Sequence, residues 1–546
     1  MFPYSTERFT KEQEDLLSLY VTDTSGPVFA LVNLDEAVKG ALFARYSRSS
    51  KSLRRLFLDE FAGDLTTSPD NASVAHVGAG RALQLYDRVF SEYGDDSVAQ
   101  LGGVHLACEQ ASNILTKLLE RGRIMSYLEQ STRYIPYDSR LTNGRYRYYR
   151  DPAVLASALG AAYVAGMDSA FEGYHKLIPI VQAFLAKKYP NTSGESDVAH
   201  RRALKAKALD LLRGLLPAGS LSNVGIYGSG QAYEKLVLRL RSSALPEANH
   251  YAELILEQLR KVIPSFLTRL DRPDRGGRWQ AYIEDTRKRT MDEVAKMSGS
   301  LPATVIQNGV GDAVGPTVRL VDFDPSGEEK VIEAIIFESS TISYEEAREM
   351  AMAMDTASRA SLIDVYAGNR ENRRHKPGRA FEATSYTFEI VSDYGAFRDL
   401  QRHRLLTIEW QQLSPELGYD VPEEIDEAGL RREYIDIVER SKALYLTMSE
   451  EFPVQAPYAL PLASKIRYVM GLNAREAMHL IELRSMPQGH ESYRNVSLQM
   501  HDLIRDVAGH RALADAMSFV HRDTPALPRM SAECRAVASR SKTSTT

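Results

Sequence analysis

The chain has 546 residues, 44% of them hydrophobic and 25% charged, which are the proportions of a globular protein long enough for two large domains. A net charge of −5 and the lack of a run of ~20 apolar residues exclude a general attraction to nucleic acid and a membrane span, so we expect neither as a partner. Two distant cysteines, Cys108 and Cys534, exclude a disulfide framework and a thiolate metal site. The polar start lacks the apolar core of a signal peptide, which favours a cytoplasmic location.

Hydrophobic periodicity predicts that the first half of the chain is mainly helical. Helices are expected over residues 11–19, 104–119, 153–188, 198–216, 232–241 and 251–263, and a short strand over residues 28–32. The second of these helices has one apolar stripe, made of Ile114, Leu115, Leu118 and Leu119. It leads directly into segment 120–134, which carries an unusual set of polar side chains.

Residues 301–316 are rich in glycine, proline and small side chains and form the predicted linker. The linker separates a first domain, 1–300, from a second domain, 317–526, and a polar tail, 527–546, is expected to be flexible. In the second domain we expect a strand over 318–323 and helices over 328–337, 427–448, 466–484 and 495–507. Residues 384–390 fit either a half-buried strand or the start of a helix.

Segment 120–134 combines Arg121, Arg123 and Arg133 with Glu129 and Ser131, a mixture that no hydrophobic core requires. A second Arg-X-Arg follows 281 positions later, at 402–404, and each half has a later helix that ends in Leu-Arg-Ser. The shared order indicates a duplicated chain, although short motifs of this kind also arise by chance.

These residue types suit an anionic ligand, because a guanidinium donates two parallel hydrogen bonds and stays charged. Ser131 offers a hydroxyl to the same phosphate, and Glu129 is suited to accept a hydrogen bond from a base or a ribose. The alternative is a surface ion pair between Glu129 and Arg133, which would be neighbours if the segment were helical.

The predicted helix over 466–484 raises a geometric question. At 100° per residue, Arg475, His479 and Glu482 share one face, and Asn473 and Arg484 lie on the other side. Either the helix begins after Asn473 or it lies between two ligands.

Segment 120–134 resembles the signature of the flavin-dependent thymidylate synthases. That signature is Arg-His-Arg, seven residues and Ser, with Glu two before the Ser and Arg-Tyr after it. Here the Arg-X-Arg at 121–123, Glu129, Ser131 and the Arg-Tyr at 133–134 match, but Gly122 replaces the His. The later triplet at 402–404 keeps its His, but Gln412 stands in place of the Ser and Ser414 in place of the following Arg.

The family's later motifs are also divided between the halves. Asn-Ala-Arg at 473–475 and Leu-Arg at 483–484 match in the second half, where the first half has Gly-Gln-Ala at 230–232. The family's Arg before Leu-Pro matches Arg213 in the first half, where the second half has Pro457.

The resemblance implies an α+β fold with two related helix-rich domains, each with a small sheet, similar to a fused dimer of the family. It implies one composite site between the halves, with the second site degenerate. The nucleotide side would consist of Glu129, Ser131, Arg133, Arg213, Arg402 and Arg484. The flavin side would consist of Arg402, His403, Arg404, Asn473, Arg475 and His479.

The resemblance further implies methylation of deoxyuridylate through FAD, with methylenetetrahydrofolate and NADPH as co-substrates. The chemistry would be borne by the flavin, so no catalytic residue is assigned, and no metal is expected. A homodimer that mimics the family's four-subunit assembly is expected. Two alternatives stay open: a catalytically inactive nucleotide- or flavin-binding pseudoenzyme, and a flavoenzyme of the same fold with another pyrimidine nucleotide as substrate.

Overall fold

The computed structural model describes residues 7–26, 29–46, 49, 51–62, 100, 102–133, 135–191, 196–298, 315–531 and 533–535. The chain forms two compact units that are interleaved in sequence. The first unit comprises Met1–Glu109, Leu118–Glu129 and Asn223–Ser300, and the second comprises Gln110–Lys117, Gln130–Ser222 and Leu301–Thr546. Of the predicted linker, only Gly315 and Pro316 lie within the described residues, so the domain boundaries at 301–316 stay a prediction.

The first unit is built on a three-stranded sheet with the strand order β1-β3-β2. Its strands are β1 (Gly103–Ser112), β2 (Met125–Glu129) and β3 (Leu221–Ser229). Strands β2 and β3 are antiparallel, and Met125 pairs with Gly228. The helices are α1 (Lys11–Ser18), α2 (Glu36–Tyr46), α3 (Leu53–Leu56), η1 (Phe57–Phe61), α9 (Gly230–Arg241), α10 (Pro246–Arg260), η7 (Pro264–Asp271), η8 (Pro273–Gly277) and α11 (Arg278–Ser298). Helix α5 (Asn113–Leu119) follows β1 and lies mostly in the second unit.

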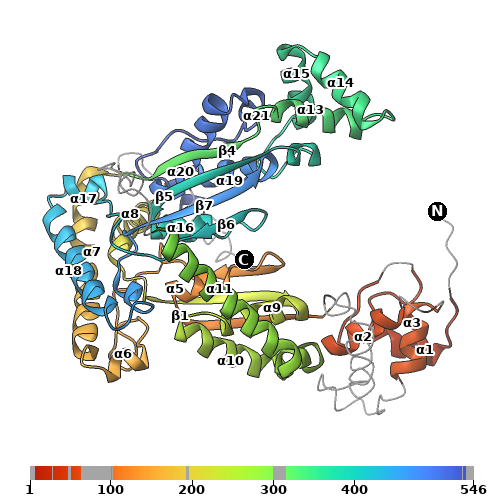
Figure 1. Ribbon diagram of the computed structural model, residues 1–546, viewed down its shortest axis with the longest axis horizontal. Helices are drawn as coiled ribbons and strands as arrows, with labels where there is room; N and C mark the ends of the chain where they lie inside the picture. The colour runs from red at the N-terminus through yellow and green to blue at the C-terminus, as the bar shows by residue number, and fades with distance from the viewer. Residues whose placement is uncertain are drawn as a thin grey trace. The chain divides into compact units, whose positions relative to one another are not determined.

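The second unit contains a four-stranded antiparallel sheet with the order β4-β5-β7-β6. Its strands are β4 (Thr317–Phe323), β5 (Ser385–Asp393), β6 (Thr407–Trp410) and β7 (Lys465–Asn473). One face is buried because alternate side chains of the two central strands are apolar, as at Tyr386, Phe388 and Ile390 of β5. Helix α20 (Glu491–Asp502) packs along β4 and β5 (Figure 1).

Helices from both halves of the sequence complete the second unit. They are α6 (Pro152–Ala156), α7 (Gly160–Lys188), α8 (Asp197–Leu212), η6 (Arg213–Leu215), α13 (Gly327–Glu338), α14 (Tyr344–Ala353), α15 (Thr356–Ala367), η9 (Arg379–Glu382), α16 (Tyr394–Leu400), α17 (Glu423–Glu427), α18 (Arg431–Ser449), η10 (Ala456–Ala459), α19 (Ala474–Arg484), η11 (Leu503–Val507) and α21 (Arg511–Asp515). Helices α7 and α18 pack together, and a Cβ on Gly166 or Gly173 of α7 would lie 2.8 or 2.5 Å from a side chain of α18. Glycine at these two positions therefore lets the two helices approach closely.

The two halves repeat one order of elements. Strands β1, β2 and β3 of the first half correspond to β5, β6 and β7 of the second, and the sheet orders β1-β3-β2 and β5-β7-β6 agree. Within the second unit, the backbone of Ala218 donates to Leu460 at 2.7 Å, and Leu462 donates to Leu216 at 2.9 Å. This reciprocal pair surrounds a bridge between Pro217 and Pro461, as a two-fold relation between similar halves requires.

The α+β class with two small antiparallel sheets is thus confirmed, but two predicted helices begin as strands. Residues 104–112 belong to β1, and only 113–119 are helical. Residues 466–473 belong to β7, and α19 starts at Ala474 with Asn473 as its N-cap. Short segments that mix apolar and polar residues fit either structure, and pairing with neighbouring strands decides between them.

Other predicted elements differ at their ends. The helix over 153–188 is two helices, α6 and α7, and the last turn of the helix over 198–216 is the 3-10 helix η6. Residues 384–390 form part of a strand, β5. In the expected strand 28–32, Leu31 makes only an isolated bridge to Val21, and residue 28 lies outside the described residues. Among the described helices, none combines the length and the apolar character needed to cross a membrane.

Candidate functional site

Arg133 lies in the loop that follows β2, within the second unit, and it is held by the partly buried carboxylate of Asp210. Its Nε donates to Asp210 Oδ1 at 2.8 Å, and its Nη2 donates to Asp210 Oδ2 at 2.9 Å. Its Nη1 donates to the Tyr493 hydroxyl at 2.7 Å, and Nη2 also donates to the carbonyl of Gln488. These bonds use four of the five N–H groups of the side chain, which fixes its orientation.

A second arginine shares the same carboxylate. Arg529 Nη2 donates to Asp210 Oδ2 at 2.7 Å, and Arg529 Nη1 donates to the backbone carbonyl of Arg133 at 3.1 Å. Burial alone would raise the pKa of Asp210, but Arg133 and Arg529 overcome this effect and lower it to about 2. Asp210 is therefore ionised at neutral pH.

Another carboxylate, the buried Asp399, gathers arginines from both halves of the chain. Arg402 pairs with it from three residues further along the chain, just after α16 ends. Arg213 Nη1 lies 3.5 Å from Oδ2, and Arg484 Nη1 lies 3.7 Å from Oδ1. Burial favours the neutral acid, but these guanidinium groups hold the pKa of Asp399 well below its ordinary value. Arg213 comes from η6 of the first half, whereas Arg402 and Arg484 come from the second.

Tyr493 connects the two arginine groups. The guanidinium carbon of Arg133 lies 5.6 Å from its ring centroid and that of Arg484 lies 5.5 Å from it, which is cation–π distance. Asp393 contributes a third carboxylate near Arg213, and it accepts hydrogen bonds from Ala396 N and from the Ser492 hydroxyl.

The arginine cluster carries more positive than negative charge. It consists of five arginines and three carboxylates, namely Arg133, Arg213, Arg402, Arg484, Arg529, Asp210, Asp393 and Asp399, an excess of two positive charges. Arg213 Nη2 is buried and makes no hydrogen bond within the described part of the chain. A buried donor without a partner is costly, so this atom favours an anionic ligand at the cluster.

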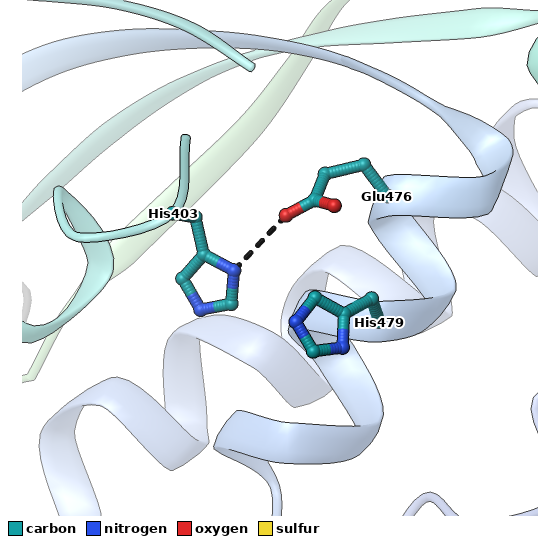
Figure 2. Close-up of side chains that lie close together, drawn as sticks. All are labelled: His403, Glu476 and His479. Atoms are coloured by element: carbon teal, nitrogen blue, oxygen red, sulfur yellow. Dashed lines mark hydrogen bonds and ion pairs between the residues drawn. The ribbon is translucent and has the colours of Figure 1, made fainter. Parts of the chain in front are cut away.

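His403 links the arginine cluster to helix α19. Its Nε2 accepts from Arg484 Nε at 3.0 Å, and its Nδ1 lies 3.0 Å from Glu476 Oε1 (Figure 2). Because the guanidinium only donates, Nε2 carries no proton and Nδ1 donates to Glu476. Burial, followed by the charge of Arg484, holds the pKa of His403 well below its ordinary value, so the ring is neutral.

His479 lies on α19, one turn after Glu476. Its ring centroid is 5.4 Å from that of His403 (Figure 2). Burial, with the charges of Lys376 and Arg373, lowers the pKa of His479 to about 4. Burial raises the pKa of Glu476 to about 7. Two neutral imidazoles and a carboxyl group that titrates near neutrality therefore lie side by side.

The spacing of these three side chains also fits a metal site, since their ligand atoms lie within 4.8 Å of one another. Two observations oppose a cation there. A metal on Nδ1 of His403 would leave the proton on Nε2, pointing at the N–H of Arg484. The surrounding charges of Lys376, Arg373 and Arg484 are also positive. That no metal binds here remains a prediction, and both the tautomer of His403 and the positive charges support it.

The other predicted site residues of this group, Glu129, Ser131 and Arg404, differ in burial and in their contacts. Glu129 is buried at the end of β2 in the first unit, and the Ser131 hydroxyl accepts from the backbone N–H of Arg133 in the second. The alternative of a surface ion pair between Glu129 and Arg133 is wrong, because the segment is not helical and Arg133 pairs with Asp210. Arg404 is exposed.

Two predicted flavin-side residues make structural contacts around α19. Asn473 accepts from the backbone N–H of Glu476 and caps the helix, which settles where the helix begins. Arg475 donates to the carbonyl of Pro377 and lies 3.5 Å from Glu382. The structure thus brings Arg133, Arg213, Arg402 and Arg484 together, whereas Arg475 points to a neighbouring loop.

Sequence reasoning missed the carboxylates and Arg529. Asp210 precedes Arg213 by three residues and Asp399 precedes Arg402 by three, spacings that place each pair on one helical face. That signal is common on solvated helices and does not single out a site. Arg529 lies in the segment whose composition indicates a flexible tail, yet its exposed fraction is only 5%.

A central side chain in the first-half triplet would require neighbouring side chains to shift. A Cβ on Gly122 would lie 2.6 Å from the hydroxyl of Tyr127, which donates to the carbonyl of Gly122 at 3.1 Å. The helix caps also revise the alignment of the halves: Ser229 caps α9 as Asn473 caps α19, so the counterparts of Asn-Ala-Arg are Ser-Gly-Gln at 229–231.

One family model matches both halves of the chain, and two relatives are similar over nearly its whole length. The family model described as "Thymidylate synthase complementing protein" matches residues 38–265 and 319–509, one segment in each half. A "UPF0159 protein" of Chlamydia muridarum is 37% identical over 532 residues, which cover 96% of this chain and 98% of that protein. A "UPF0159 protein" of Thermoplasma acidophilum is 30% identical over 529 residues, covering 91% and 98%. A crystal structure of a UMP/dUMP methylase from Streptomyces cacaoi, bound with 5-Br dUMP, is 22% identical, with a TM-score of 0.32, and covers 39% of this chain and 98% of that one.

Proposed function

We propose that this chain, which belongs to the thymidylate synthase complementing protein family, is a flavin-dependent enzyme that methylates deoxyuridylate at one composite site. Methylenetetrahydrofolate is the carbon donor and NADPH the reductant in this proposal. The site combines arginines from both halves with the His403–Glu476–His479 group.

The observation that carries the proposal is the meeting of the two halves at Asp399. Arg213 of the first half reaches the same carboxylate as Arg402 and Arg484 of the second. The excess positive charge and the buried Nη2 of Arg213 suit a dianionic phosphate, the group common to pyrimidine nucleotides.

The flavin side also suits an anionic dinucleotide. His479 is neutral and has the positive charges of Lys376, Arg373 and Arg475 around it, a donor set that fits the pyrophosphate of FAD better than a cation. When bound, FAD supplies the redox chemistry of methyl-group formation. The protein residues then bind and orient the ligands and exclude water from the site.

The protein's own residues provide a defined proton position next to this group. Arg484 holds the proton of His403 on Nδ1, where it faces the carboxyl group of Glu476. With a pKa of about 7, Glu476 gains or loses its proton at neutral pH without a large free-energy cost.

Cys108 does not act as a nucleophile in this mechanism. Burial raises the pKa of Cys108 to about 12, so its thiolate is scarce at neutral pH.

Two measurements test the proposed function. Purified protein titrated with FAD should bind it and acquire the flavin absorbance, and protein that stays colourless would refute the proposal. Labelled deoxyuridylate, incubated with methylenetetrahydrofolate, NADPH and FAD, should yield labelled thymidylate.

The second candidate function is that of an inactive nucleotide- or flavin-binding protein. One observation that favours it is that Asp210 already pairs with Arg133, the arginine expected to bind phosphate. Another is that Gly122 replaces the His of the first-half triplet. Binding of FAD and deoxyuridylate without turnover would support it. Turnover of another pyrimidine nucleotide under the same conditions would instead indicate a changed substrate.

A further inference from the structure

We propose that Arg529 is a positioning residue that compensates the charge of Asp210, so that Arg133 keeps a positive potential for the nucleotide phosphate. The inference rests on the proposed function. It assigns a role to the segment after residue 509, where the match to the family model ends.

The geometry places one carboxylate between two guanidinium groups. Asp210 Oδ1 accepts from Arg133, and Oδ2 accepts from both Arg133 and Arg529, at 2.9 and 2.7 Å. Arg133 and Asp210 alone would form a neutral pair with little attraction for an anion. Arg529 restores one positive charge to the group of three.

Burial makes this charge effective. The exposed fractions of the side chains are 11% for Arg133, 19% for Asp210 and 6% for Arg529. Water screens charges weakly at such sites, so the loss of one guanidinium changes the local potential more than it would at the surface.

Arg494 holds the segment that carries Arg529. The side chain of Arg494 is buried and donates to the carbonyls of Ser485, His521 and Asp523 and to the Thr524 hydroxyl, at 2.8 to 3.3 Å. This anchor is independent of Asp210. Substitution of Arg529 therefore removes a charge without releasing the start of the segment.

A purely structural role predicts a different outcome. If Arg529 served only to pin the C-terminal segment, neutralising Asp210 would not repair its loss. If it compensates charge, a variant that lacks both groups regains the positive potential of Arg133. The two roles are separated by one double variant.

The experiment uses the full chain and isothermal titration with two probes, deoxyuridylate and inorganic pyrophosphate. We expect Arg529→Met to weaken binding about tenfold, while Arg529→Lys and the double variant Asp210→Asn/Arg529→Met bind within about threefold of the original protein. A cavity of about 90 Å³ beside Asp210 and Arg529 has room for the water that a shorter lysine needs. The control is Arg522→Met, which removes an exposed ion pair with Asp502 from the same segment.

Each outcome is decisive. Unchanged affinity in Arg529→Met, or a double variant as weak as the single one, overturns the inference. If pyrophosphate binding follows the expected pattern but deoxyuridylate does not bind, the inference stands and the proposed function fails. If the original protein binds neither probe, both are overturned.

Discussion

Arg484 donates through Nε to Nε2 of His403 at 3.0 Å, and this bond sets the tautomer of the imidazole. The proton of His403 consequently lies on Nδ1, toward Glu476. Because Arg484 also reaches Asp399, one side chain connects the arginine cluster to the pair of neutral histidines.

Glu476 makes stability depend on pH in a definite direction. Its pKa is raised from 4.5 to about 7 in the folded chain, so its contribution to stability is full below pH 4.5 and is lost by pH 7. Relative to Glu476→Gln, the original protein should lose about 3 kcal/mol of unfolding free energy between pH 4.5 and 7. Urea unfolding of both proteins across this range measures the difference. If the unfolding free energies of the two proteins changed in parallel with pH, the prediction would be contradicted. Glu450→Gln, at an exposed position, serves as the control.

Asp399 is required for the stability of the arginine cluster. Asp399→Asn leaves Arg213, Arg402 and Arg484 without their shared carboxylate and should cost about 3–5 kcal/mol of unfolding free energy. Asp506→Asn, which removes an exposed pair with Arg505, should change it by less than about 0.5 kcal/mol. Equal effects, measured by urea unfolding at pH 7, would show that Asp399 is not the centre of the cluster.

The composite site predicts which substitutions weaken nucleotide binding. Arg133→Ala and Arg484→Ala should each reduce the affinity for deoxyuridylate by about tenfold or more, since each removes a buried positive charge. Ser414→Ala, at the position where the family has an arginine, should leave the affinity unchanged. The measurement is equilibrium binding by calorimetry, and the same loss in all three variants would refute the division of roles between the halves.

The close packing of α7 and α18 predicts a steric effect. Gly173→Val places a side chain against Ile437, whose Cδ1 lies 2.5 Å from the position of the new Cβ, and should cost about 1–3 kcal/mol. Gly173→Val combined with Ile437→Ala should recover part of that loss. Thermal unfolding of both variants gives the comparison, and a valine variant as stable as the original protein would show that the helices do not need this contact.

The sequence predicted what depends on short motifs and local periodicity. The duplicated order and the helices around Arg213 and Arg484 followed from such patterns, whereas the α+β class followed from the resemblance to a known family. Strand β7 did not, although Ile466, Tyr468, Met470 and Leu472 alternate as in a strand, because the apolar residues continue without a break into α19. Pairing between β5 and β7 across the sheet decides the structure there.

The partners of Arg133 depended on contacts that no local pattern encodes. Asp210 lies 77 positions from Arg133 in the sequence, and Arg529 lies 319 positions from Asp210. A single sequence shows arginines suited to phosphate but not the carboxylates that meet them. The net charge at the site could therefore be determined only from the folded structure.

A crystal structure of the protein with deoxyuridylate and FAD tests the composite site most directly. We predict that the nucleotide phosphate lies within hydrogen-bonding distance of Arg213 from the first half and of Arg402 or Arg484 from the second. A phosphate bound by residues of one half alone, or remote from Asp399, would contradict the account.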